Sequence, residues 1–112
     1  MEDRFEISML LDYYSSLLTE KQLNIMNLYY NEDLSLAEIA DLNKTSRQAT
    51  FDLIKRCSKQ LSAYEEKLKL LDKYRQRVIL KEKLLEKLSD NKSLSEEELK
   101  IIDSNIDEII NA

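Results

Sequence analysis

Apolar residues recur every three or four positions through most of the chain, which is the spacing of amphipathic helices. The first stripe, over residues 3–17, consists of Phe5, Met9, Leu10, Tyr13, Tyr14 and Leu17. Thr19 and Gln22 have the spacing of a capping box, in which each side chain bonds the other residue's backbone amide. This pair opens a second stripe of Leu23, Met26 and Tyr30. The pattern therefore predicts one helix over residues 3–17 and another over residues 20–30.

A short helix and a long helix are expected next. Ser35 and Glu38 form a second capping box, which starts a helix that ends near Leu42. Ser46 is the expected N-cap of the following helix. Its apolar positions are Ala49, Leu53, Ile54, Cys57 and Leu61. The same spacing continues through Tyr64, Leu68 and Leu71 as a seven-residue repeat, so we expect this helix to extend to about residue 72.

Two more helical segments are expected in the C-terminal third. One covers residues 74–88 and ends at a turn that begins with Ser89. Ser95, followed by three glutamates, then caps the last helix. The inward positions of that helix are expected to be Leu99, Ile102, Ile106 and Ile109.

The short helix and the long helix together have the features of a helix-turn-helix. In this motif the first helix braces the second, whose N-terminal residues enter the major groove of DNA. The crossing of the two helices needs a small residue, and Ala40 fits that position, with Ile39 and Ile54 in the core around it. We therefore predict an all-α fold with a helix-turn-helix domain over residues 1–62. A helical C-terminal extension over residues 63–112 is expected to continue it as one structural unit.

The composition leaves little room for catalysis or metal binding. The 112 residues suffice for one domain, and they include no glycine, proline or histidine and a single cysteine, Cys57. No disulfide, zinc-ligand set or imidazole base can be assembled, so we expect no enzyme activity, no cofactor and no metal site. The acidic start and the lack of an apolar run of about 18 residues predict a cytoplasmic protein without membrane insertion.

The net charge of -5 is distributed unevenly along the chain. Residues 1–43 contain two bases and nine acids, residues 44–83 twelve bases and five acids, and residues 84–112 three bases and eight acids. The middle segment therefore has a charge of +7 between two acidic segments. A polyanion, DNA or RNA, explains this concentration of bases better than solubility does.

The first turns of the long helix contain the candidate nucleic-acid contacts. Helix-turn-helix geometry places six residues on the outer face, namely Ser46, Arg47, Gln48, Phe51, Asp52 and Lys55. With the bases that follow, the candidate nucleic-acid contacts are Ser46, Arg47, Gln48, Phe51, Lys55, Arg56 and Lys59. Arginine and glutamine can bond base edges, whereas Asp52 on the same face repels phosphates and Phe51 offers no donor. Two interpretations stay open: a regulator that binds DNA, or an adaptor that binds protein or RNA without reading a DNA sequence.

Several segments of the chain resemble the YlxM family of small bacterial proteins. The resemblance covers residues 5–75, and it rests on Leu18-Thr-Glu-Lys-Gln, Leu28-Tyr-Tyr, Ser35-Leu-Ala-Glu-Ile-Ala, Ser46-Arg-Gln-Ala and Ile54-Lys-Arg. It implies an orthogonal helical bundle similar to region four of sigma factors and to the winged-helix superfamily. It also implies a regulator linked to the signal recognition particle, since the family's genes lie beside those of the particle. A component of the particle, or RNA polymerase, is then a candidate partner.

The sequence departs from the family pattern at three positions. Asn43 replaces an apolar residue, Lys44 replaces the glycine or asparagine of the left-handed turn position, and Thr50 replaces a valine. Leu42 is the expected substitute for the missing apolar contact.

A homodimer is expected, because the long helix and the segment after it expose more apolar surface than one small domain can cover. The residues concerned are Tyr64, Leu68, Leu70 and Leu71. Pairing of two long helices, or exchange of the C-terminal tails, would cover them. If the tail instead folds back on its own chain, the protein is a monomer.

Overall fold

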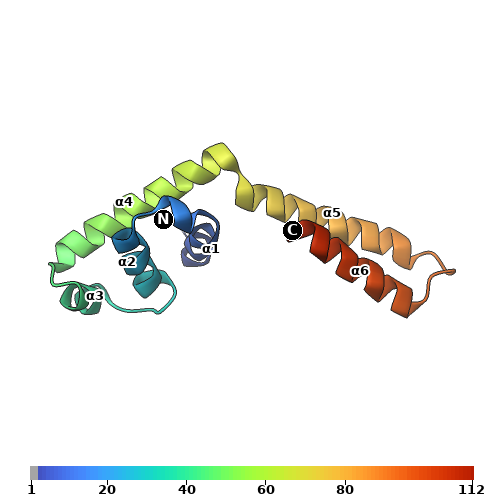
Figure 1. Ribbon diagram of the computed structural model, residues 1–112, viewed down its shortest axis with the longest axis horizontal. Coiled ribbons are helices and arrows are strands. Elements are labelled where there is room, and N and C mark those ends of the chain that lie inside the picture. Colours follow the sequence, from blue (N-terminus) through green and yellow to red (C-terminus); the bar gives the residue numbers. More distant parts are fainter. Residues whose placement is uncertain (1–2) are drawn as a thin grey trace. The chain divides into compact units, whose positions relative to one another are not determined.

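The computed structural model describes residues 3–112, and every regular element in this range is helical (Figure 1). The α-helices are α1 Arg4–Tyr14, α2 Glu20–Tyr30, α3 Leu36–Leu42, α4 Arg47–Leu68, α5 Leu70–Ser89 and α6 Glu96–Ile110. A 3-10 turn, Ser15–Leu17, follows α1. The all-α fold expected from the sequence is confirmed. None of these helices combines the length and hydropathy needed to cross a membrane.

Side-chain caps explain where most helices begin. Complete capping boxes stand at the starts of α2, α3 and α6, and they are formed by Thr19 with Gln22, Ser35 with Glu38, and Ser95 with Glu98. The Ser46 hydroxyl accepts a hydrogen bond from the Ala49 amide at 3.0 Å and so caps α4. These bonds satisfy amides that have no partner within their own helix. The predicted starts of these four helices are confirmed.

The chain forms two compact units, of which the first extends to Leu71 and the second comprises Asp72–Ala112. Helices α1 to α4 of the first unit enclose one core, whose fully buried members include Ile7, Leu11, Tyr14, Ile25, Met26, Ile39, Cys57, Leu61 and Leu71. Residue 62, the expected domain boundary, lies within α4. The first unit continues beyond it because Tyr64 and Leu71 also pack on this core.

Helix α1 turns a different face to the core from the one expected. Its buried residues are Ile7, Leu10, Leu11 and Tyr14, whereas Phe5 is 69% exposed and Leu17 is also exposed. Two residues correspond to about 200° of rotation around a helix, so Phe5 and Ile7 lie on opposite sides. The stripe assigned from the sequence mixed both sides of this helix, and only its central members contact the core.

Helix α4 ends at Leu68, four residues before the expected end. Lys69 adopts the left-handed conformation, with φ 55°, and its amide donates to the Glu65 carbonyl at 2.8 Å. Helix α5 then begins at Leu70. Tyr64 and Leu71 of the seven-residue repeat are covered within the first unit, while Leu68 and Leu70 remain exposed.

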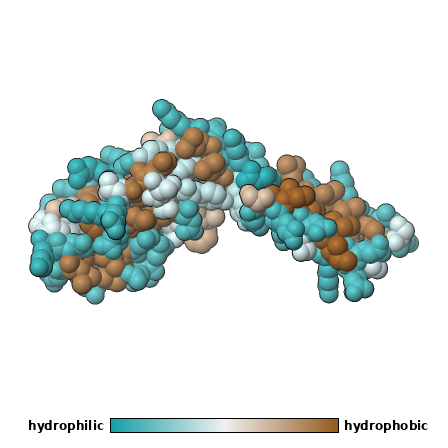
Figure 2. Space-filling model, in the orientation of Figure 1, coloured by the Kyte–Doolittle hydropathy of each residue, from teal (hydrophilic) through white to brown (hydrophobic). Residues whose placement is uncertain are grey.

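The second unit is an antiparallel hairpin of α5 and α6 (Figure 1). Lys81 of α5 forms ion pairs with Asp103 and Asp107 of α6. The apolar residues of its seam are only half-buried: Val78, Leu85, Leu88, Leu99, Ile102, Ile106 and Ile110. Ile109 was expected in this seam but is 75% exposed, because the inner row of α6 advances by four residues from Ile106 to Ile110. Apolar residues accordingly appear on the hairpin's surface in Figure 2.

Candidate nucleic-acid interface

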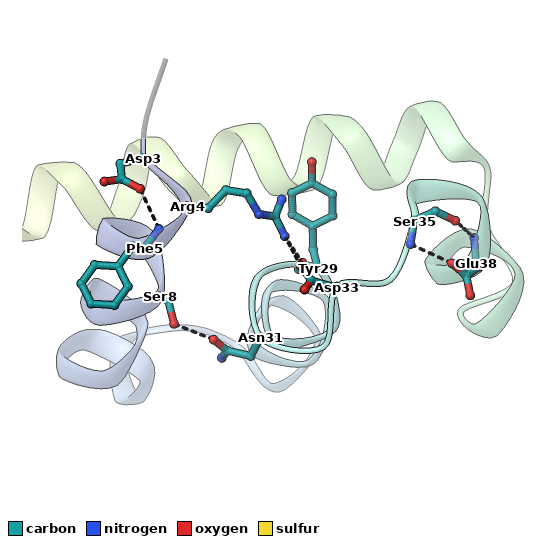
Figure 3. Close-up of polar contacts among 9 residues, drawn as sticks. All are labelled: Asp3, Arg4, Phe5, Ser8, Tyr29, Asn31, Asp33, Ser35 and Glu38. Carbon is teal, nitrogen blue, oxygen red and sulfur yellow. Dashed lines mark hydrogen bonds and ion pairs between the residues drawn. The ribbon is translucent and has the colours of Figure 1, made fainter.

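Helices α3 and α4 pack around a small residue, as the helix-turn-helix prediction requires. Ala40 and Ile39 of α3 are buried, as is Ile54 of α4, so their expected places in the core are confirmed. The Ser35 hydroxyl and amide bond the Glu38 backbone and carboxylate (Figure 3). These bonds with Ser35 hold the pKa of the Glu38 carboxyl below its usual value and fix the start of α3.

The turn between α3 and α4 is closed by backbone bonds. The Thr45 amide donates to the Ala40 carbonyl at 3.0 Å, and the Lys44 amide donates to the Asp41 carbonyl at 3.4 Å. This is the Schellman pattern, in which the residue after the C-cap is left-handed. Lys44 holds that place with φ 53°, as its position in the sequence suggested.

Leu42 does not replace the apolar contact that was expected to be missing at Asn43. Its side chain is 64% exposed. Asn43 is half-buried instead, and its amide nitrogen donates to the Ile39 carbonyl at 3.0 Å. A polar bond to the helix end therefore takes the place of the apolar contact.

The seven sequence-predicted contact residues lie together on the side of α4 that faces away from the core. All are exposed: Ser46, Arg47, Gln48, Phe51, Lys55, Arg56 and Lys59. The buried residues of α4 lie opposite them and include Thr50, Ile54, Cys57 and Leu61. None of the bases Lys55, Arg56 and Lys59 pairs with an acid among the described residues, so this part of the face has unneutralised positive charge over about one turn of the helix.

Gln48 and Asp52 are joined on the same face. The Gln48 side-chain nitrogen donates to the Asp52 carboxylate at 3.0 Å. The bond orients the glutamine amide, and its carbonyl oxygen and second N–H stay available to a ligand. Asp52 also places a negative charge within the row of bases.

Thr50 anchors the first turn of α4 from inside. Its side chain is buried, and its hydroxyl donates to the Ser46 carbonyl at 3.0 Å. The Thr50 hydroxyl therefore has its hydrogen-bond partner within the helix. Cys57, two turns further on, is fully buried, and burial raises the pKa of its thiol. The interpretation of Cys57 as a core residue is confirmed.

A groove beside the exposed face of α4 was not foreseen from the sequence. It has a volume of about 640 Å³ and is lined by Arg4, Tyr29, Tyr30, Leu36, Phe51, Ile54, Lys55, Ser58 and Lys59. We call it the α4 groove. Its residues come from α1, α2, α3 and α4, so only the tertiary fold brings them together.

Arg4 lines the α4 groove beside Tyr29 and Tyr30. Its guanidinium lies 4.5 Å from the ring centre of Tyr29 and 5.1 Å from that of Tyr30. It also donates to the Tyr29 carbonyl and pairs with Asp33 at 3.1 Å (Figure 3). The Tyr30 and Ser58 hydroxyls are bonded to each other at 3.1 Å, which joins α2 to α4 below the groove. The described residues contain no group of three or more metal-ligating side chains.

Comparison with known proteins identifies relatives along the whole chain. A family model described as "Putative helix-turn-helix protein, YlxM / p13 like" matches residues 1–102. A UPF0122 protein of Clostridium perfringens (strain SM101 / Type A) is 65% identical over 112 residues, which is 100% of both chains. A UPF0122 protein of Clostridium botulinum (strain Alaska E43 / Type E3) is 61% identical over 98 residues, covering 88% of this chain and 90% of its own. The chain therefore belongs to the UPF0122 family of YlxM-like helix-turn-helix proteins.

Proposed function

We propose that this protein is a regulator that binds duplex DNA through α4 and has no catalytic activity. One observation carries the proposal: the exposed face of α4 has four bases and a glutamine, Arg47, Gln48, Lys55, Arg56 and Lys59, and α3 packs against this helix. In such proteins the start of the second helix enters the major groove. The buried Ala40 allows α3 to support α4 at close range.

The residues on the exposed face of α4 suit different parts of DNA according to their distance from the start of the helix. Arg47 and Gln48 lie in the first turn, where they can bond base edges. Lys55, Arg56 and Lys59 lie further along the helix, where they suit phosphates on either side of the groove. Phe51, 43% exposed, offers apolar contact to a thymine methyl group.

An adaptor that docks on another protein or on RNA is the second candidate. The apolar α4 groove beside Phe51 favours it, because DNA phosphates gain little from an apolar surface. Asp52 favours it as well, since its carboxylate repels phosphates. A component of the signal recognition particle and RNA polymerase are the partners that the family resemblance implies.

For the cellular setting we propose the signal recognition particle pathway, on the family resemblance alone. Gene order tests this part of the proposal. If the gene for this protein lies directly upstream of the gene for the particle's GTPase or for its receptor, the pathway proposal is supported. If the gene is not linked to them, the pathway proposal is weakened.

Binding of labelled duplex DNA and of single-stranded RNA, measured by fluorescence anisotropy over a series of salt concentrations, tests the function. Duplex binding should weaken steeply with salt, since each phosphate contact contributes about 0.9 to the slope of log affinity against log salt. The variant Lys55→Gln/Arg56→Gln/Lys59→Gln should lower that slope by as much as about 2.7.

The matched control is Lys83→Gln/Lys87→Gln/Lys92→Gln, which removes three exposed bases of the second unit and should leave the slope unchanged. Arg47→Ala should weaken a duplex selected from a random pool more than it weakens random duplex. If neither polymer binds at low salt, the DNA proposal fails and the protein adaptor remains.

A further inference from the structure

We propose that the α4 groove binds the exposed face of α6 from a second copy of the chain. Self-association would then occur through two identical contacts, each between the groove of one copy and the α6 of the other. The proposal rests on the match between two surfaces that the fold leaves uncovered.

The lining of the α4 groove combines apolar and basic residues. The aromatic and aliphatic members are Tyr29, Tyr30, Leu36, Phe51 and Ile54. Its charged lining residues are Arg4, Lys55 and Lys59, and no acid lies among the lining residues. The volume of about 640 Å³ is in the range that holds several side chains of a partner. An occupant of this groove therefore needs bulky apolar groups flanked by negative charge.

The outer face of α6 has this composition. Ile101 and Ile109 are 57% and 75% exposed and lie about 12 Å apart along the helix axis. Glu97, Glu98 and Glu108 are exposed around them, and the five residues fall within about 120° of the helix surface. The two isoleucines offer an occupant of the groove two bulky apolar groups with carboxylates beside them.

The two surfaces have opposite charge. Arg4 is already paired with Asp33 and the Glu98 carboxylate accepts from the Ser95 amide, so the complementary charges are Lys55 and Lys59 of the groove and Glu97 and Glu108 of α6. A phosphate polymer supplies the charge but no apolar group for Tyr29, Tyr30 and Leu36. Each copy has one groove and one α6, so two copies can exchange two identical contacts.

Self-association has a consequence that rests on the proposed DNA-binding function. Phe51, Lys55 and Lys59 line the groove and also belong to the proposed DNA contacts. A second copy seated there would cover them, so dimer formation and DNA binding through this face compete.

Sedimentation equilibrium of the full chain without nucleic acid, over a concentration series up to about 100 µM, tests the contact. The wild type should shift with concentration from 13.2 kDa towards twice that mass. The groove variant Lys55→Glu/Lys59→Glu and the helix variant Ile101→Glu/Ile109→Glu should each stay monomeric, with unchanged helicity by circular dichroism. An equimolar mixture of the two should associate again, because one intact groove and one intact α6 remain.

The control Ile79→Glu/Leu80→Glu changes two equally exposed apolar residues of α5 and should dimerise like the wild type. The proposal is overturned if the wild type stays at 13.2 kDa, if the control dissociates as the helix variant does, or if the mixture stays monomeric. Since no nucleic acid is present, failure here leaves the DNA proposal standing, and failure of DNA binding leaves this contact standing.

Discussion

The Tyr14 hydroxyl donates a hydrogen bond of 2.6 Å to the carboxylate of Glu65, 51 residues further along the chain. The same hydroxyl accepts from the Leu70 amide at 3.1 Å, and the same carboxylate oxygen accepts from the Leu71 amide at 3.1 Å. The first amides of a helix have no partner within it. Tyr14 and Glu65 together therefore supply the cap of α5, directly after the left-handed Lys69.

Tyr14→Phe should destabilise the first unit by about 1 to 3 kcal/mol, because the half-buried Glu65 carboxylate and the Leu70 amide each lose a partner. Urea unfolding at neutral pH, followed by circular dichroism, measures this change. Tyr29→Phe is the matched control. Its hydroxyl makes no bond within the described structure, so stability should hardly change.

The hydrogen bond between Tyr14 and Glu65 also predicts how the stability of the first unit depends on pH. Burial, and then the bond to Glu65, raise the pKa of Tyr14 above its usual 10.0. The folded state therefore keeps the proton more tightly than the unfolded state, so the stabilisation is complete below pH 10 and declines as pH rises further. The difference in stability between wild type and Tyr14→Phe should be constant from pH 7 to 9 and become smaller above pH 10. A difference that grows above pH 10 would contradict this assignment.

The caps and the helix-turn-helix could be predicted from the sequence because their signals are local. Ser35 and Glu38, for example, are three residues apart and determine the start of α3 by themselves. The end of α4 was missed because lysine favours helices, and only the bonds from Tyr14 and Glu65 make the break at Lys69 favourable. The α4 groove was missed for a related reason. Arg4, Tyr29 and Phe51 meet only after four helices have packed.

Replacement of either lysine that has the left-handed conformation by glycine should have the same effect on the stability of the fold. Lys44 and Lys69 have φ of 53° and 55°, a region that costs a residue with a side chain about 1 kcal/mol relative to glycine. Lys44→Gly and Lys69→Gly should each raise the free energy of unfolding by up to about 1 kcal/mol in urea titrations. The control Lys73→Gly, in the interior of α5, should lower it by about the same amount. A loss of stability at either left-handed position would contradict the conformation assigned to it.

Asp52→Asn should strengthen binding to duplex DNA. The change removes a negative charge from the row of Lys55, Arg56 and Lys59, and asparagine keeps the oxygen that accepts from Gln48. We expect a several-fold gain in affinity at low salt that fades at high salt, because screening weakens exposed charges. Anisotropy with random duplex measures it, and Asp12→Asn on α1 is the control for the change in net charge. Equal gains in the two variants would mean that α4 does not face the phosphates.

Lys81 should stabilise the hairpin of α5 and α6 more than any other single charge there. Its ammonium lies 2.7 Å from the Asp103 carboxylate and also pairs with Asp107. These ion pairs join α5 to α6, whose facing apolar residues are only half-buried. Asp103 and then Asp107 raise the pKa of Lys81 above the usual 10.5, so the folded hairpin retains the proton. This stabilisation is complete below pH 10.5 and is lost as pH rises beyond it.

Lys81→Met keeps a long apolar stem but leaves Asp103 and Asp107 facing each other one turn apart on α6, where like charges repel. Amide hydrogen exchange at pH 7 should accelerate across α6 and the second half of α5, while α1 to α4 keep their protection. In the wild type 1 M salt should accelerate the same amides, and in the variant it should slow them by screening the two aspartates. Lys83→Met, at an exposed position of α5, is the control and should exchange like the wild type. If Lys81→Met also leaves α6 protected, the apolar seam alone holds the hairpin and the ion pairs contribute nothing measurable.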